Sequence, residues 1–140
     1  MDNKASKKLV VYYSNGGNTK FIADNIAGSV GADVVELKPK KDIPKGFLGM
    51  VIGGFQAKFR AKPALLSYDK DPENYDIIYI GTPIWAGTFA PALNTFFKNE
   101  RLVNKRIAFF CCYSGNEGTS IEDVKEALYQ NIFLGEIGFI

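Results

Sequence analysis

The stretch VVYYSNGGNTKFIADNI, residues 10–26, decides the fold of this chain. Its first four residues are β-formers and predict a buried strand, and apolar residues then recur at helical spacing from Ile22 onward. A loop of small and hydroxylated residues, 14–19, separates the two. The first amides of a helix have no internal partner, the helix dipole is positive at that end, and glycine lets the backbone approach a ligand closely. The stretch therefore predicts a strand, an anion-binding loop and a helix.

The composition of the loop narrows the kind of anion. It has no lysine like the one that a nucleoside-triphosphate loop places on its phosphates, it is too short for the Walker spacing, and it lacks the G-x-G-x-x-G fingerprint of dinucleotide sites. The donors that remain are the hydroxyls and side-chain amides of Ser14, Asn15, Asn18 and Thr19, together with the backbone N–H groups of the loop, including those of Gly16 and Gly17. Such a set suits one terminal phosphate held without a metal. A capped strand–helix turn that binds nothing is the alternative.

This segment resembles the phosphate-binding signature of flavodoxins. In that signature an apolar strand and an aromatic residue lead into Ser or Thr, a small residue, Thr, and then Ala and an apolar residue at helical spacing. These places are filled here by Val10, Tyr12, Ser14, Gly17, Thr19, Ala23 and Ile26. The resemblance spans nearly the whole chain. It implies a flavodoxin-like fold with FMN as the cofactor, its phosphate lying in the loop 14–19.

Apolar strand patterns alternate with helical patterns along the rest of the chain. Strands are predicted over residues 9–13, 33–37, 77–81, 107–113 and 134–139. Helices are predicted to begin at Thr19, Phe47, Pro91 and Thr119, the last with a capping box formed by Thr119 and Glu122.

The second predicted helix has its own pattern. Phe47, Val51, Phe55 and Phe59 recur every four residues and predict its buried apolar stripe. Glycines inside the helix lower its propensity, and close packing against a sheet would explain them.

Five strands alternating with four helices predict one domain, residues 1–140, of the three-layer α/β class. Right-handed crossovers and a phosphate loop after the first strand fit a flavodoxin-like doubly wound parallel five-stranded sheet in the order 2-1-3-4-5. A flavodoxin has a fifth helix after the last strand, and we expect this chain to lack it. The first helix would then share its face of the sheet with bare apolar surface, which predicts self-association or a partner at that face.

The loop after the third strand, residues 82–89, contains the only tryptophan of the chain. Trp85 offers a broad face for a flat ligand, and a core or interface aromatic is the alternative reading. The segment 75–97 is similar to the stretch of flavodoxin-like proteins that flanks the flavin ring. That similarity implies that the FMN contacts come from Thr82, Pro83, Ile84, Trp85, Ala86 and Gly87. In flavodoxins a peptide of this loop turns over on reduction, and Gly87 permits the positive φ that this needs.

The loop after the fourth strand supplies a third set of contacts. Tyr113 would cover the second face of the flavin, and the amides of Ser114 and Gly115 would meet its polar edge. The same residues also suit a plain loop.

Charge and cysteine content limit the partners and the location. With 17 Lys and Arg against 15 Asp and Glu, the net charge is +2, too weak to indicate nucleic acid or a membrane surface as a partner. Flavodoxins that shuttle electrons to cationic partners are strongly acidic, so the usual redox partner proteins are in doubt here. The polar N-terminus and the absence of a long apolar run predict a cytoplasmic protein without a signal peptide.

Two adjacent cysteines lie in the fourth predicted strand. The side chains of Cys111 and Cys112 would point to opposite faces, so we expect no disulfide between them. We expect small buried apolar side chains there, with a redox role as the alternative.

These features together predict an FMN-binding redox protein that carries low-potential electrons between protein partners. No separate nicotinamide motif is visible, which favours a carrier over an FMN-dependent NAD(P)H:acceptor reductase of the quinone type. A cofactor-free interaction module on the same fold is a further alternative. No catalytic residue and no metal ligand is predicted, because the flavin itself handles the proton chemistry.

Two other functions of this topology are excluded by the residues at their key positions. A phospho-receiver needs an acidic cluster after the first strand and an aspartate ending the third, where this chain has Ser14, Asn15 and Gly81. A small phosphatase needs a cysteine in the first loop, and both cysteines lie elsewhere.

Overall fold

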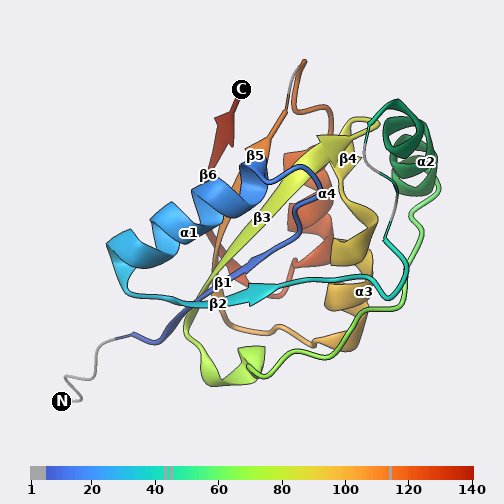
Figure 1. Cartoon of the computed structure of the whole chain (residues 1–140). Helices are drawn as coiled ribbons and strands as arrows, with labels where there is room; N and C mark the ends of the chain where they lie inside the picture. The colour runs from blue at the N-terminus through green and yellow to red at the C-terminus, as the bar shows by residue number, and fades with distance from the viewer. Residues whose placement is uncertain (1–5, 43, 45, 114) are drawn as a thin grey trace, which may run out of the picture.

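The computed structural model describes residues 6–42, 44, 46–113 and 115–140 (Figure 1). Its elements, in chain order, are β1 Lys8–Tyr12, α1 Asn18–Val30, β2 Asp33–Glu36, α2 Phe47–Lys58, the 3-10 turn η1 Pro72–Asn74, β3 Ile77–Trp85, β4 Thr88–Phe89, α3 Pro91–Asn99, β5 Arg106–Cys112, α4 Ser120–Ala127 and β6 Ile132–Phe139. None of the helices in the described part of the chain combines the length and apolar character that a bilayer crossing needs.

Five parallel strands form the main sheet in the order β2-β1-β3-β5-β6. Counted along the chain without the short β4, this is the predicted order 2-1-3-4-5, so the predicted fold class is confirmed. One strand differs from its prediction: β3 continues past Gly81 to Trp85, because Ile84 and Trp85 pair with β4 in an antiparallel hairpin.

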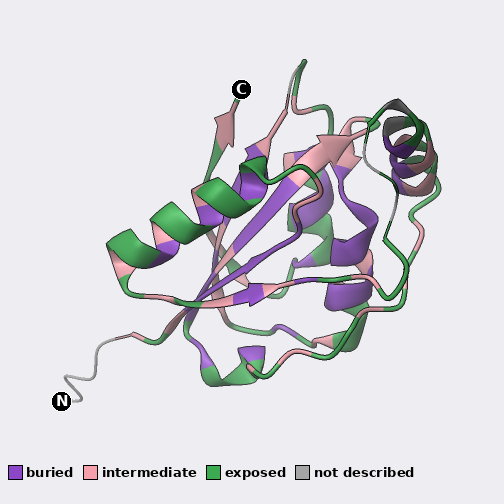
Figure 2. Cartoon of the chain, in the orientation of Figure 1, coloured by how far each residue is buried: buried purple, intermediate pink, exposed green. Residues whose placement is uncertain are grey.

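Helices cover both faces of the sheet. In Figure 1, α1 lies in front of the strands, and α3 and α4 lie behind them. Alternate residues of each strand therefore enter different cores: Val10, Tyr12 and Phe110 pack on the α1 side, and Val11 and Ile78 pack on the other. Figure 2 shows β1 almost wholly buried, the carboxyl end of β3 only partly buried, and the outer side of α1 exposed. The buried parts of the central strands thus hold in place the partly exposed ends that follow them.

The edge strand β6 leaves apolar side chains open to solvent on the α1 side. Ile137 is paired in register with Phe110, which belongs to the α1-side core, and Ile137 is 55% exposed. Ile132 on the same strand is 59% exposed. No helix follows β6 in the described part of the chain. Self-association through this face stays a prediction.

The predicted buried stripe of α2 was wrong. Val51, Phe55 and Phe59 are 54%, 66% and 64% exposed, and the side chain of Phe47 lies outside the described residues. Among the side chains of α2 that the structure describes, the buried ones recur at the same spacing on the other side of the helix and are small: Gly49, Gly53 and Ala57. Close approach explains this, because a Cβ added at Gly49 would lie 1.6 Å from the carbonyl oxygen of Pro44. The loop before α2 thus leaves no room for a side chain at Gly49.

Candidate functional site

A cavity of about 630 Å³ opens at the carboxyl ends of β1, β3 and β5. That volume lies within the range of small-molecule sites. Nine of the residues predicted from the sequence line it: Ser14, Asn15, Gly16, Asn18, Thr19, Pro83, Ile84, Trp85 and Tyr113. Five residues that were not predicted also line it: Phe21, Ile22, Cys112, Phe139 and Ile140. The structure therefore brings residues from all three predicted loops to one cavity.

The other predicted residues lie near the cavity without lining it. They are Gly17, Thr82, Ala86, Gly87 and Gly115, while Ser114 lies outside the described residues. Thr82 is fully buried, and its hydroxyl donates to the carbonyl oxygen of Pro83 at 2.7 Å and accepts from the N–H of Ala90 at 2.9 Å. This hydroxyl therefore holds the β3 segment in place rather than facing the cavity.

The first loop places the opening turn of α1 at the cavity. Gly17 caps α1 in the left-handed region at φ 101°, and its N–H donates to the Ser14 hydroxyl oxygen at 3.1 Å. The amides of the first helical turn, beginning at Asn18, have no acceptor within the helix. No side chain among the described residues that line the cavity carries a charge. An anion in this loop would thus be held by amides, hydroxyls and the helix dipole, without a lysine or arginine.

Trp85 also lines the cavity, and its indole ring packs against another aromatic side chain. The ring of Tyr13 meets it edge-on, with the centroids 5.4 Å apart and the planes at 85°. The Tyr13 hydroxyl donates to Asp42 Oδ1 at 2.6 Å. Burial raises the pKa of Tyr13, and the bond to Asp42 raises it further, so the hydroxyl stays protonated and able to donate. The indole is therefore held by a ring that is itself anchored.

The hairpin that carries Trp85 turns through two residues with positive φ. Ala86 has φ 50° and Gly87 has φ 75°, which is the geometry of the primed turns that join twisted antiparallel strands. The carbonyl oxygen of Gly87 accepts from the N–H of Thr119 at 2.7 Å. A Cβ added at Gly118 would lie 2.2 Å from the same oxygen. The tip of the hairpin is thus clamped to the start of α4 by a glycine–glycine contact.

A buried carboxylate reinforces this clamp. Asp123 Oδ2 accepts from the hydroxyls of Thr88 at 2.6 Å and Thr119 at 2.9 Å, and its other oxygen lies 3.6 Å from Arg60. The Thr119 side chain makes no capping bond to the helix amides, so the predicted capping box with Glu122 does not form. The physical reason is the backbone: Thr119 has φ −100° and ψ 16°, outside the extended conformation that an N-cap residue normally adopts.

The two cysteines point to opposite faces of the sheet, as predicted, and both are free. Cys111 is in the core on the side of α3 and α4, where burial raises its pKa to about 12. Cys112 lines the cavity. Burial raises the pKa of its thiol, and a hydrogen bond from Thr19 partly opposes that change. Cys112 is therefore a neutral thiol beside the anion loop.

One of the lining residues that was missed, Cys112, could have been predicted from the alternation of side chains along its strand. The prediction used only the loops after the strands, whereas side chains at the strand ends also face the site. Cys112 is two residues after Phe110, so it lies on the α1 side, and its register partners are Pro83 and Phe139. Extending the alternation of β5 to its last residue would have found Cys112.

Comparisons with known proteins agree with this geometry. A family model described as flavodoxin matches residues 7–136. The chain is similar to a flavoprotein from Lactobacillus acidophilus solved in complex with FMN, with 24% identity, a TM-score of 0.82, and coverage of 96% of this chain and 93% of that one.

Two flavodoxins also share the fold. The two-electron reduced flavodoxin of Megasphaera elsdenii has 17% identity, a TM-score of 0.61 and coverage of 94% and 85% of the two chains. A flavodoxin from the domain Archaea has 18% identity, a TM-score of 0.59 and coverage of 94% and 82%. At these identities the likeness concerns the fold. Among curated proteins, none matches the chain.

Proposed function

The chain belongs to the flavodoxin family, and from this we propose that it binds FMN in the 630 Å³ cavity and carries low-potential electrons between protein partners in the cytoplasm. The observation that supports this most is the composition of the cavity, whose lining combines uncharged polar residues at the N-terminus of α1 with the aromatic side chains of Trp85 and Tyr113. FMN has the matching parts, a phosphate and a flat ring system.

The residues present fit the phosphate of FMN. Gly16 has nothing within 4 Å of the position where a Cβ would stand, so the loop leaves open space beside its backbone. The amides that follow Gly17 and the side chains of Asn15 and Asn18 are suitable donors. The helix dipole would stabilise a doubly charged phosphate. The described lining contains no lysine or arginine of the kind that binds a longer phosphate chain.

The residues present also fit the ring of FMN, which when bound supplies the electron-transfer chemistry. Trp85 and Tyr113 would shield it from water. Of the two carbonyls in the hairpin turn, that of Gly87 is taken by the Thr119 amide. The Ala86 carbonyl is thus the one able to turn toward a ligand. Gly87 tolerates the backbone change that this requires.

A carrier is the function proposed here, and two alternatives are tested alongside it. Steady oxidation of NADH or NADPH by the FMN-loaded protein would indicate a reductase of the quinone type. A protein that takes up no flavin would indicate a cofactor-free interaction module. A reductase would require a cavity that admits a second substrate beside FMN. A cofactor-free module would require a cavity that binds no flavin.

The direct test is a titration of the FMN-free protein with FMN and with riboflavin, followed by the quenching of flavin fluorescence. Riboflavin lacks the phosphate, so it is the matched control for the α1 loop. We expect saturable binding of FMN and at least about hundredfold weaker binding of riboflavin, which corresponds to about 3 kcal/mol from the phosphate. Equal affinities for FMN and riboflavin would show that the loop before α1 does not bind the phosphate. No uptake of FMN would refute the proposed function.

A further inference from the structure

Helix α2 presents large apolar side chains to solvent. Leu48, Val51, Phe55 and Phe59 are 60%, 54%, 66% and 64% exposed, and we call these four residues the α2 patch. The rings of Phe55 and Phe59 lie 4.7 Å apart between centroids. The opposite side of the helix carries the buried small residues Gly49, Gly53 and Ala57, so the large side chains are on the solvent side. Grouped exposed apolar side chains of this kind mark interaction surfaces.

Positive charge surrounds the α2 patch. Residues 38–62 contain seven lysines and arginines and one aspartate, although the whole chain has a net charge of only +2. The cations of this segment that the structure describes are all exposed: Lys38, Lys40, Lys41, Lys58, Arg60 and Lys62. Within the described residues, only Lys38 and Arg60 of this set form salt bridges. The other four cations are available to a partner. We call all six exposed cations the basic rim.

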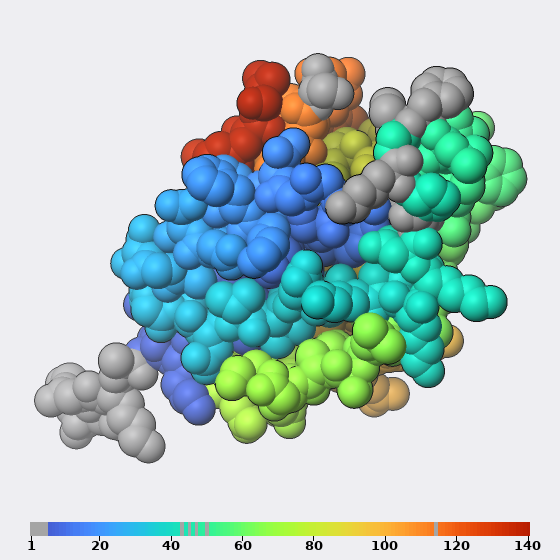
Figure 3. Space-filling view, viewed as in Figure 1, coloured from blue at the N-terminus to red at the C-terminus, as the bar shows by residue number. Residues whose placement is uncertain are grey.

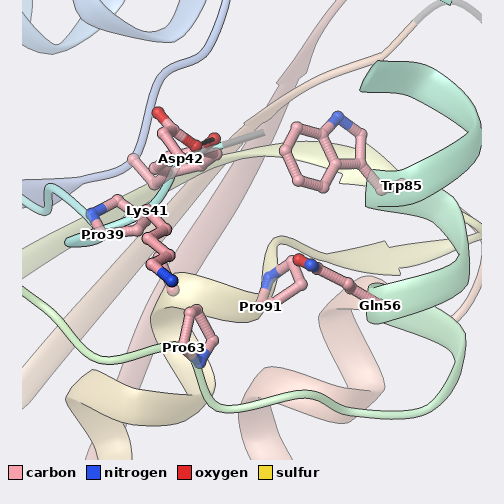
Figure 4. A pocket seen from close by; sticks show the side chains of 9 residues that line it. Pro39, Lys41, Asp42, Gln56, Pro63, Trp85 and Pro91 are labelled. Carbon is pink, nitrogen blue, oxygen red and sulfur yellow. Dashed lines mark hydrogen bonds between the residues drawn. The ribbon is translucent and has the colours of Figure 1, made fainter. Parts of the chain in front are cut away.

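Helix α2 and the loop before it lie beside Trp85, which lines the candidate FMN cavity. Gln56 of α2 and Lys41 of the preceding loop line a small hollow together with Trp85, and Figure 4 shows Gln56 projecting from the helix into it. Trp85 also lines the large cavity. In the space-filling view the segment before α2 and α2 itself lie beside each other on the right of the molecule (Figure 3). A protein bound at α2 would therefore be close to whatever Trp85 covers.

The charge of this surface decides between possible occupants. In a symmetric dimer through α2, each basic rim would face its own copy, and the like charges would repel. An acidic protein would instead be attracted at long range and would bury the apolar side chains at contact, with the apolar centre and polar rim typical of protein interfaces. An anionic membrane also attracts a basic, apolar helix. The position beside the cofactor cavity favours the protein, because electron exchange requires that the two redox centres come close.

We propose that the α2 patch and the basic rim dock an acidic one-electron redox protein. This proposal rests on the proposed function, because the electron exchanged with the partner belongs to FMN in the adjacent cavity. One electron leaves the reduced partner, which is oxidised, and enters the flavin, which is reduced, with one proton taken from water to balance the charge. The surface thus selects partners opposite in charge to those of the acidic flavodoxins.

The test uses the full chain loaded with FMN and a reduced acidic two-iron ferredoxin as the probe. Stopped-flow flavin absorbance measures the rate of electron transfer at several salt concentrations. The variant Lys58→Glu/Lys62→Glu reverses two charges of the rim, and Lys98→Glu/Arg101→Glu, at and just after the end of α3, reverses two charges on another exposed surface as the matched control. We expect the rim variant to react at least about tenfold more slowly at low salt, the control to stay within about twofold of the wild type, and added salt to remove the difference.

A second pair of variants tests the apolar centre. Phe55→Ser should weaken ferredoxin binding at least about fivefold, whereas Tyr129→Ser, at a residue 77% exposed elsewhere, should leave it unchanged. Binding is measured by anisotropy of labelled ferredoxin with and without FMN, so docking can be read even if the protein takes up no flavin. Rates that do not distinguish the rim variant from the control Lys98→Glu/Arg101→Glu overturn the proposal. So does a Phe55-dependent dimer in sedimentation, or Phe55-dependent binding to phosphatidylserine vesicles without binding to ferredoxin.

Discussion

The glycine–glycine contact that clamps the Trp85 hairpin makes a sharp prediction for Gly118→Ala. The new Cβ would stand 2.2 Å from the carbonyl oxygen of Gly87 and 2.4 Å from its Cα, both backbone atoms. Ordinary contacts of this kind are about 3.5 Å, so the hairpin or the start of α4 must retreat by about 1 Å. Gly118 also has φ 58°, where an alanine is strained. The substitution thus perturbs the position of Trp85 without touching the cavity itself.

The expected magnitude combines backbone strain with a broken hydrogen bond. The left-handed conformation costs an alanine about 1–2 kcal/mol, and loss of the hydrogen bond from Thr119 to Gly87 costs about 1 kcal/mol. We therefore expect the free energy of unfolding to fall by about 2–3 kcal/mol. If the indole moves with the hairpin, its stacking contribution of about 0.5–1.5 kcal/mol is lost, and the Kd for FMN rises up to about tenfold.

The assay is urea unfolding followed by the fluorescence of Trp85, together with titration by FMN. Gly115→Ala is the control for the unfolding measurement, since a Cβ at Gly115 meets nothing within 4 Å and its φ is not positive, and the affinity for FMN is compared with that of the wild type. The reasoning is refuted if Gly118→Ala unfolds within about 0.5 kcal/mol of Gly115→Ala and binds FMN as tightly as the wild type.

Three further predictions concern reactivity, pH and assembly. In the FMN-free protein we expect iodoacetamide to label Cys112 before the buried Cys111, and FMN to slow the labelling of Cys112; equal labelling of both cysteines by mass spectrometry would contradict this. Burial raises the pKa of Tyr12 from the usual 10.0 to about 12, so its contribution to stability is complete below pH 10 and is lost as the pH rises toward 12. Unfolding at stepped pH should therefore show a steeper alkaline loss in the wild type than in Tyr12→Phe, and parallel curves would count against it. Finally, sedimentation velocity should show self-association of the wild type that Ile137→Lys weakens, and a strictly monomeric wild type at high concentration would argue against an interface at β6.

Much of the candidate site could be predicted from the sequence because it depends on order along the chain. Parallel strands end at the same edge of a sheet, so the loops after the first, third and fourth predicted strands had to meet there. The residues 14–19 and Trp85 were found in this way. Of the residues missed, Cys112 and Phe139 belong to strands and reach the cavity through the register between neighbouring strands, and Phe21 and Ile22 belong to α1.

The sequence by itself determined the order of strands and helices and the loop that opens the first helix, because periodicity and turn-forming residues act over a few positions. Periodicity also shows which residues share one side of a helix, but it does not show which side the protein buries. In α2 the tertiary structure decided this: the small side, Gly49, Gly53 and Ala57, packs inward, and the phenylalanines at 55 and 59 remain in solvent. The clamp of Asp123 on the hairpin was likewise decided in three dimensions, since Thr88 and Asp123 are 35 residues apart. Contacts between distant segments depend on how closely whole elements can approach, and that is a property of the packed molecule.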